Sequence, residues 1–163
     1  RGEQFIEAIQ ETLTLSTMIF FMLVGAEIFG YFLSVSRISQ SLVELVASMN
    51  MTPYSVLACV LILYVILGCV MDSIAMLLLT VPVVYPIVIA AGFDPIWFGI
   101  LTVITVEMGL ITPPVGMNAF VIKSVAPDIP ITQIFRGVMP FVLSDLVRLA
   151  LLIAFPSLVF ALM

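Results

Sequence analysis

Charge and histidine are what this sequence has least of. Its 163 residues include no histidine, and only 9% of them are charged. A soluble domain is about 25% charged and about 45–50% apolar, whereas this chain is 63% hydrophobic and has a mean hydropathy of +1.34. So few polar residues cannot cover the surface of a soluble enzyme, and a disordered segment needs the opposite composition. We therefore expect an integral membrane protein and not a soluble enzyme.

The same scarcities limit partners and cofactors. Five Lys and Arg against ten Asp and Glu give a net charge of −5, which leaves no basic surface for nucleic acid. Cys59 and Cys69 lie in an apolar stretch, and without histidine we expect no zinc or iron site, only buried thiols that pack as small apolar groups. The chain opens with Arg1, and no basic stretch precedes an apolar core, so we expect no signal peptide.

Long apolar stretches are what the sequence does contain. A helix needs about 20 apolar residues to cross the hydrocarbon of a membrane, and open sheet edges cannot lie in lipid, so the expected architecture is an all-α helical bundle. Residues 1–11 are expected to lead into the interface as a helix. The predicted segments are a first span with an amphipathic connector over 1–50 (Thr12–Val35, then Ser34–Met49), a helical hairpin over 52–91 (arms Thr52–Gly68 and Ile74–Ala90), a broken helix over 95–124 and a last span over 138–163.

Smaller features refine these segments. Glu27 is expected to mark a bend in the first span, and the connector is expected to bury one helical face. Basic residues concentrate on the cytoplasmic side of membranes and aromatic residues at the two interfaces. The distribution of basic residues therefore predicts that the side of the membrane that holds the N-terminus is cytoplasmic. The residues concerned are Ile38, Leu42, Leu45 and Val46 on the connector face, Arg1, Lys123 and Arg136 on the N-terminal side, Arg37 on the opposite side, and Tyr54 and Trp97 as interface anchors.

The first interruption of an apolar stretch is the run Gly68-Cys-Val-Met-Asp-Ser-Ile-Ala-Met. Its two arms are either full spans joined by a surface turn or a re-entrant hairpin, since each is a little shorter than the ~30 Å hydrocarbon core. Pro82 and Pro86 are expected to divide the second arm into short helical pieces. Asp72 can neutralise a cation, cap the following helix, or do both. The hydroxyl of Ser73 suits Na⁺ but also suits a helix cap.

The second interruption is the run Glu107-Met-Gly-Leu-Ile-Thr-Pro-Pro-Val-Gly-Met-Asn-Ala-Phe. Proline has no N–H, so Pro113 and Pro114 are expected to leave the carbonyls of Gly109 and Leu110 without helical partners. An unwound helix inside a membrane needs protein, water or ions to satisfy its free backbone groups, and discontinuous helices of this kind bind Na⁺ and substrate anions. A simple kink is the alternative. Two successive prolines between glycines favour the ion or substrate site.

Four motifs in order resemble the large membrane subunit of tripartite ATP-independent periplasmic (TRAP) transporters. The resemblance runs over nearly the whole chain and corresponds to the C-terminal half of that subunit. The N-terminal half of the family, an inverted repeat of this one, is missing, so we expect the chain to be part of a longer protein. The motifs are Gly68-Cys-Val-Met-Asp-Ser-Ile-Ala-Met-Leu-Leu-Leu-Thr-Val-Pro, Gly92-Phe-Asp-Pro-Ile-Trp-Phe-Gly, Gly109-Leu-Ile-Thr-Pro-Pro-Val-Gly-Met-Asn, and Ala126-Pro-Asp-Ile-Pro with Phe135-Arg-Gly-Val-Met-Pro.

The resemblance implies a function and a fold. Members of the family are multi-pass proteins of the bacterial inner membrane that import carboxylates, such as C4-dicarboxylates or sialic acid, with a Na⁺ gradient. They work with a small membrane subunit and a periplasmic binding protein, and no cofactor other than Na⁺ is expected. The fold is similar to that of elevator-type ion transporters, in which re-entrant hairpin tips face unwound helices.

The same resemblance implies a site between the two interruptions. Residues 68–75 would form the hairpin tip and Gly109–Asn118 the opposed unwound segment. Glu107 could couple ions or protons, or could be a protonated glutamic acid bonded to a neighbouring helix. The implied Na⁺ site comprises Gly68, Met71, Asp72, Ser73, Gly109, Thr112, Pro113 and Gly116, and the implied substrate contacts are Ser73, Thr112 and Asn118.

Other functions compete with transport. An intramembrane protease could use Asp72 with Asp145 or Glu107, but only one of these carboxylates lies in a helix break. Another Na⁺-coupled anion transporter of similar fold, or a chain with a purely structural role, are further alternatives. Asp145 and Arg148 stand at i, i+3 and are expected to neutralise each other, although Arg148 could instead bind substrate.

Overall fold

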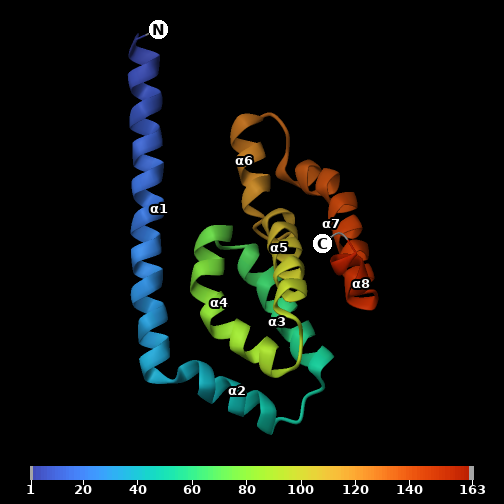
Figure 1. Cartoon of the computed structure of the whole chain (residues 1–163). Helices are drawn as coiled ribbons and strands as arrows, with labels where there is room; N and C mark the ends of the chain where they lie inside the picture. Colours follow the sequence, from blue (N-terminus) through green and yellow to red (C-terminus); the bar gives the residue numbers. More distant parts are fainter. Residues whose placement is uncertain (1, 162–163) are drawn as a thin grey trace.

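The computed structural model describes residues 2–161, which fold into helices with no strand among them (Figure 1). This confirms the predicted all-α class. By length and hydropathy, α1, α4 and α7 are each able to cross a membrane, whereas α3 and α5 are apolar but shorter. The helices are α1 (Gly2–Ser36), α2 (Ile38–Ser48), α3 (Pro53–Gly68), α4 (Ser73–Ala90), α5 (Pro95–Ile111), α6 (Met117–Val125), α7 (Ile131–Ala154) and α8 (Ser157–Phe160).

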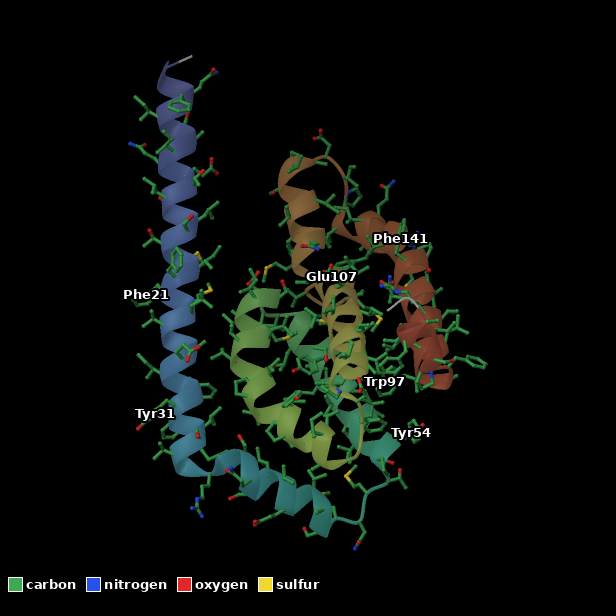
Figure 2. All side chains as sticks on the ribbon, viewed as in Figure 1. Phe21, Tyr31, Tyr54, Trp97, Glu107 and Phe141 are labelled. Atoms are coloured by element: carbon green, nitrogen blue, oxygen red, sulfur yellow. The ribbon has the colours of Figure 1, made fainter. Side chains whose placement is uncertain are left out.

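The long helix α1 stands apart from the other helices over most of its length (Figure 1). Its 35 residues extend about 50 Å at 1.5 Å per residue. Leu33 is its one buried hydrophobic residue within the described part, whereas Phe21 and Tyr31 are 82% and 74% exposed (Figure 2). The helix runs without interruption through Glu27, so the expected bend at that residue is wrong.

The connector helix α2 packs on the hairpin with a face that matches the predicted apolar face only in part. Ile38 and Leu45 are 37% and 57% exposed. Ser39 is instead buried, and Leu42, Val43 and Val46 are half-buried. The reason is a hydrogen bond from the Ser39 hydroxyl to the carbonyl of Pro82 in α4, which turns a polar residue inward.

The hairpin consists of α3, a four-residue tip (residues 69–72) and α4. Thr52 caps α3 by accepting a hydrogen bond from the Ser55 amide, and Pro53 follows in the first turn, where its missing N–H costs nothing. The expectation that Pro82 and Pro86 divide the second arm is wrong, because α4 is one helix, which curves through Figure 1.

The predicted broken helix is confirmed. α5 begins at Pro95, capped by Asp94, and ends at Ile111, and α6 begins at Met117 and continues toward the end of the molecule that holds the start of α1 (Figure 1). The five residues between them, 112–116, form the unwound segment. The hydrophobic core lies where α3, α4, α5 and the end of α7 meet and includes Tyr64, Met76, Val88, Trp97, Leu101 and Val106.

The last long helix, α7, begins at Ile131 rather than at Val138 and ends at Ala154, before Pro156. The end of the predicted last span, Leu162 and Met163, lies outside the described residues, as does Arg1. Trp97 is 3% exposed, and its indole Nε1 donates a hydrogen bond of 3.0 Å to the carbonyl of Leu152 in α7. The expected role of Trp97 as an interface anchor is therefore wrong, whereas Tyr54 is 60% exposed at the start of α3.

Candidate ion and substrate site

The tip of the hairpin and the unwound segment lie at a similar level, near the middle of the length of α1 (Figure 1). Next to them, Gly68, the last residue of α3, approaches Gly109 of α5 closely. A Cβ atom added to Gly109 would lie 2.9 Å from the Gly68 Cα and 3.1 Å from the Val65 carbonyl oxygen. Only glycines allow two helix backbones to come this close. The structure thus brings the two sequence interruptions together through the ends of α3 and α5.

Asp72 is the N-cap of α4. Its Oδ2 accepts hydrogen bonds from the amides of Ile74 at 3.0 Å and Ala75 at 3.3 Å, which satisfies two of the free amide groups at the helix start. The capping role considered for Asp72 is therefore confirmed. The side chain is exposed, and a carboxylate oxygen has lone pairs beyond those two bonds.

The neighbours of Asp72 lie in two different settings. Ser73 is half-buried as the first residue of α4. Met71 packs against the hydrophobic core. Cys69 is buried, and its thiol contacts the carbonyl of Pro113 at 3.9 Å, which joins the tip to the unwound segment. Cys59 is exposed, so the expectation of a buried thiol holds for Cys69 alone.

The unwound segment keeps more of its hydrogen bonds than its two prolines suggest. The amide of Thr112 donates to the carbonyl of Gly109 at 3.1 Å, so the expectation that this carbonyl lacks a partner is wrong. The Thr112 hydroxyl donates to the carbonyl of Met108. That bond uses the hydroxyl proton and leaves oxygen lone pairs, which is what a cation requires. The Pro113–Pro114 peptide is cis.

Gly116 closes the unwound segment in a left-handed conformation with φ +54°. A Cβ atom at this position would lie 3.0 Å from the Thr112 carbonyl oxygen and 3.2 Å from the ring of Phe135 in α7. Both the dihedral angle and the lack of space therefore require glycine. Asn118 follows in the first turn of α6 with an exposed side chain, and no hydrogen bond joins that side chain to the hairpin tip in the described residues.

Glu107 does not face the tip. It lies two residues before Gly109, which places it about 160° around the helix from the surface that contacts α3. Its side chain is exposed (Figure 2). Ile100 and Val103, which helix geometry places on the same side of α5, are exposed as well. The structure therefore separates Glu107 from the other candidate site residues.

Asp145 and Arg148 form the expected pair within α7, with 2.9 Å between the carboxylate and the guanidinium. Three or more His, Cys, Asp or Glu side chains do not come together as a metal-binding group anywhere in the described part of the chain. The oxygens near the two breaks are those of peptides, hydroxyls and one carboxylate. Such ligands suit a hard cation and are poor ligands for a transition metal.

The comparisons with known proteins complete these observations. Residues 2–158 match the family model of the tripartite ATP-independent periplasmic transporter, DctM component. The chain belongs to this family. It is therefore a multi-pass protein of the bacterial inner membrane.

Several permease proteins of TRAP transporters are similar to this chain. The sialic acid TRAP transporter large permease protein of Vibrio cholerae is 33% identical over 94% of this chain and 36% of its own length. The C4-dicarboxylate TRAP transporter large permease protein of Pseudomonas aeruginosa is 34% identical over 91% of this chain and 34% of its own length. The chain thus spans about a third of these relatives. No solved structure matches it significantly.

Sequence reasoning missed one contact in the site, between Cys69 and the Pro113 carbonyl, and one outside it, between Ser39 and the Pro82 carbonyl. The Cys69 thiol was assigned only to packing, and Ser39 was one of several connector serines. The position of a proline indicates which carbonyl loses its donor, but nothing in the sequence indicates which side chain from another helix replaces it.

Proposed function

We propose that this chain is the ion- and substrate-binding portion of a Na⁺-coupled secondary transporter that imports small organic acids. The observation that carries the proposal is the close approach of Gly68 and Gly109, which brings together the ends of α3 and α5 that lead into the hairpin tip and the unwound segment. Helix breaks of this kind present carbonyl oxygens to cations and helix N-termini to anions. Family membership supports the same function.

In this proposal Na⁺ lies between the tip and the unwound segment. Asp72 supplies the charge, the hydroxyls of Ser73 and Thr112 supply neutral oxygens, and the remaining ligands are carbonyl oxygens close to the two breaks. Met71, Pro113 and Gly116 shape the backbone around the ion. Four or more oxygens can then replace its hydration shell while one carboxylate offsets its charge.

The substrate is a carboxylate that binds beside the ion. Ser73 lies at the N-terminus of α4 and Asn118 in the first turn of α6, and helix N-termini attract anions. The similar proteins are named for sialic acid and C4-dicarboxylates, which are organic acids. Which acid this protein carries is a property of the whole transporter and its binding protein.

The hairpin is re-entrant in this proposal. α3 has 16 residues and is about 24 Å long. The chain turns back after α3 at a level near the middle of α1, a helix that is long enough to cross the bilayer (Figure 1). The connection from α6 to α7 lies at the same end as the start of α1, between Lys123 in the last turn of α6 and Arg136 near the start of α7. This end is cytoplasmic in our proposal. The hairpin then enters from the periplasm, and its movement against an inverted-repeat partner is of the elevator type.

The proposed partners are a small membrane subunit and a periplasmic substrate-binding protein, with the lipid bilayer around them. Because the chain spans about a third of its relatives, a structural role is the alternative for the chain in isolation. A protease dyad has less support, since Asp145 is paired with Arg148 and Glu107 faces away from the tip.

The test is Na⁺-dependent uptake in vesicles containing the full-length permease that carries this segment, together with its partner subunits. Asp72→Asn keeps a capping oxygen and removes the charge. It should raise the Na⁺ concentration for half-maximal uptake about tenfold, which corresponds to about 1.4 kcal/mol of ion binding. Thr112→Ala should raise it as well, by a smaller factor, because it removes one neutral ligand.

The chain offers a matched control in Asp94. This residue caps α5 in the same way, with Oδ1 accepting from the amides of Ile96 at 2.8 Å and Trp97 at 3.1 Å, but lies at the far end of that helix from the break. Asp94→Asn should leave the Na⁺ dependence unchanged. If Asp72→Asn and Asp94→Asn behave alike, Asp72 is not an ion ligand.

A further inference from the structure

The starting point is a carbonyl that loses its helical partner in α4. Pro86 lies inside this helix and has no N–H, so it cannot donate to the carbonyl of Pro82 four residues earlier. A carbonyl without a donor in apolar surroundings costs free energy comparable to a lost hydrogen bond. A donor from outside the helix can satisfy it.

Ser39 of α2 provides that group. Its hydroxyl donates to the Pro82 carbonyl at 3.3 Å, and the residue is 8% exposed, one of the few buried polar side chains in the described part of the chain. Ser39, Val43 and Pro86 line one groove between α2 and α4. The bond therefore lies where α2 packs on α4, at the edge of this groove.

The same solution occurs once more in the described chain. Pro156 cannot donate to the carbonyl of Leu152, and the buried indole of Trp97 in α5 donates to it instead. In both cases a side chain from a neighbouring helix satisfies a carbonyl that a proline has freed, and it ties two helices together at that point.

The joints at the ends of α2 differ from its contact with α4. Arg37, between α1 and α2, adopts a left-handed conformation with φ 54° and makes no side-chain cap, and Asn50, before α3, has φ 48°. On the far side of Arg37, α1 buries only Leu33 among its hydrophobic residues that the structure describes. Packing on α4 thus holds α2 to the hairpin. α1 also contacts α4, but it buries little there, and Arg37 alone connects it to α2 along the chain.

We propose that Ser39 is the positioning residue that fixes the connector to the hairpin, so that α2, α3 and α4 form one body and α1 pivots against it at Arg37. The inference depends on the bond between Ser39 and the Pro82 carbonyl and is independent of any ion or substrate. It assigns a function to a serine in an amphipathic helix that otherwise resembles a passive surface segment.

The first experiment measures amide hydrogen exchange of residues 38–48 in the protein held in lipid nanodiscs. Ser39→Ala should accelerate exchange about fivefold, because a buried carbonyl loses its donor. Ser39→Thr keeps the hydroxyl and should restore protection to within about twofold of the unsubstituted protein. Ser41→Ala, an exposed serine of the same helix, is the matched control and should leave exchange unchanged.

Repeating Ser39→Ala in a Pro86→Ala protein tests whether the Pro82 carbonyl causes the faster exchange. Pro86→Ala restores a backbone N–H for that carbonyl, so Ser39→Ala in this background should change exchange less than about twofold. Equal acceleration by Ser39→Ala in both backgrounds would overturn the proposal. So would a Ser39→Ala protein that exchanges like the unsubstituted one. If Pro86→Ala fails to fold, failure of Ser39→Thr to restore protection overturns the proposal by itself.

Distances between spin labels test the single body directly. Labels replace the exposed residues Phe21 of α1, Leu45 of α2 and Tyr85 of α4 in a protein without Cys59 and Cys69. The distance distribution between the labels at positions 45 and 85 should be narrow. The distance distribution between the labels at positions 21 and 85 should be broader. A distribution from 45 to 85 as broad as that from 21 to 85 would contradict the single body.

Discussion

Two helix contacts in this protein both contain glycine, and they differ completely. Where α3 meets α5, Gly68 and Gly109 place their backbones in direct contact. Where α1 meets α4, a Cβ atom added at Gly25 or Gly30 would find nothing within 4 Å. The first contact requires glycine, and the second does not use it.

The difference separates a rigid centre from a loosely held edge. α5 buries most of its residues against α3, α4 and α7, whereas α1 is exposed along nearly its whole length. In a membrane the exposed apolar surface of α1 suits lipid or other protein segments, so exposure there carries no penalty. A site that must hold an ion in a fixed geometry belongs on the rigid centre.

The largest difference between the two contacts should appear when a glycine in each is replaced by alanine and the free energy of unfolding is compared. Gly109→Ala places a Cβ atom 2.9 Å from the Gly68 backbone, which must move. We expect a loss of about 3 kcal/mol in the free energy of unfolding, as for other overpacked cores. Thermal or denaturant unfolding of the protein in detergent, followed by circular dichroism, measures it.

Gly30→Ala is the matched control on α1. It meets no atom and gains helix propensity, so the free energy of unfolding should stay unchanged or rise by up to about 1 kcal/mol. Similar losses for the two variants would mean that the centre and the edge do not differ in packing.

The same contrast shows what the sequence could predict. Two successive prolines between glycines located the unwound segment, and a lone aspartate before an apolar stretch located the cap of α4, because both signals act within a few residues. The glycine pair Gly68 and Gly109 was placed in the site only through a family resemblance. Nothing in the sequence distinguishes these two glycines from Gly25 or Gly30, because how closely two helix backbones approach depends on the packing of both helices.

Hydrogen-bond donors from other helices explain two wrong predictions, those for the second arm of the hairpin and for Trp97. Pro86 and Pro156 each indicate which carbonyl loses its donor, but the donors, Ser39 and Trp97, come from helices distant in sequence. Without these partners, a proline-containing arm was expected to divide and a tryptophan was expected at the interface. Tertiary hydrogen bonds reversed both expectations.

Removing the indole N–H should have an intermediate effect, because Trp97 joins the centre to α7. Trp97→Phe leaves the Leu152 carbonyl without its 3.0 Å donor in a buried position. We expect a loss of about 2 kcal/mol in the free energy of unfolding, within the range for an unsatisfied buried carbonyl. Tyr54→Phe, which changes a 60% exposed ring, should cost little. Equal costs would show that the Trp97 bond contributes nothing to the attachment of α7.

The smallest effect should come from the outer face of α7, where Asp145 and Arg148 pair. Arg148 is 54% exposed and Asp145 is 21% exposed, so solvent screens the pair in the isolated chain. Arg148→Gln should therefore change the free energy of unfolding in detergent by less than about 0.5 kcal/mol, the usual worth of an i, i+3 pair at a surface. A cost above about 2 kcal/mol would instead indicate a pair shielded from water, since a buried carboxylate that loses its partner is expensive. That outcome would place the outer face of α7 with the rigid centre and would contradict the division between centre and edge.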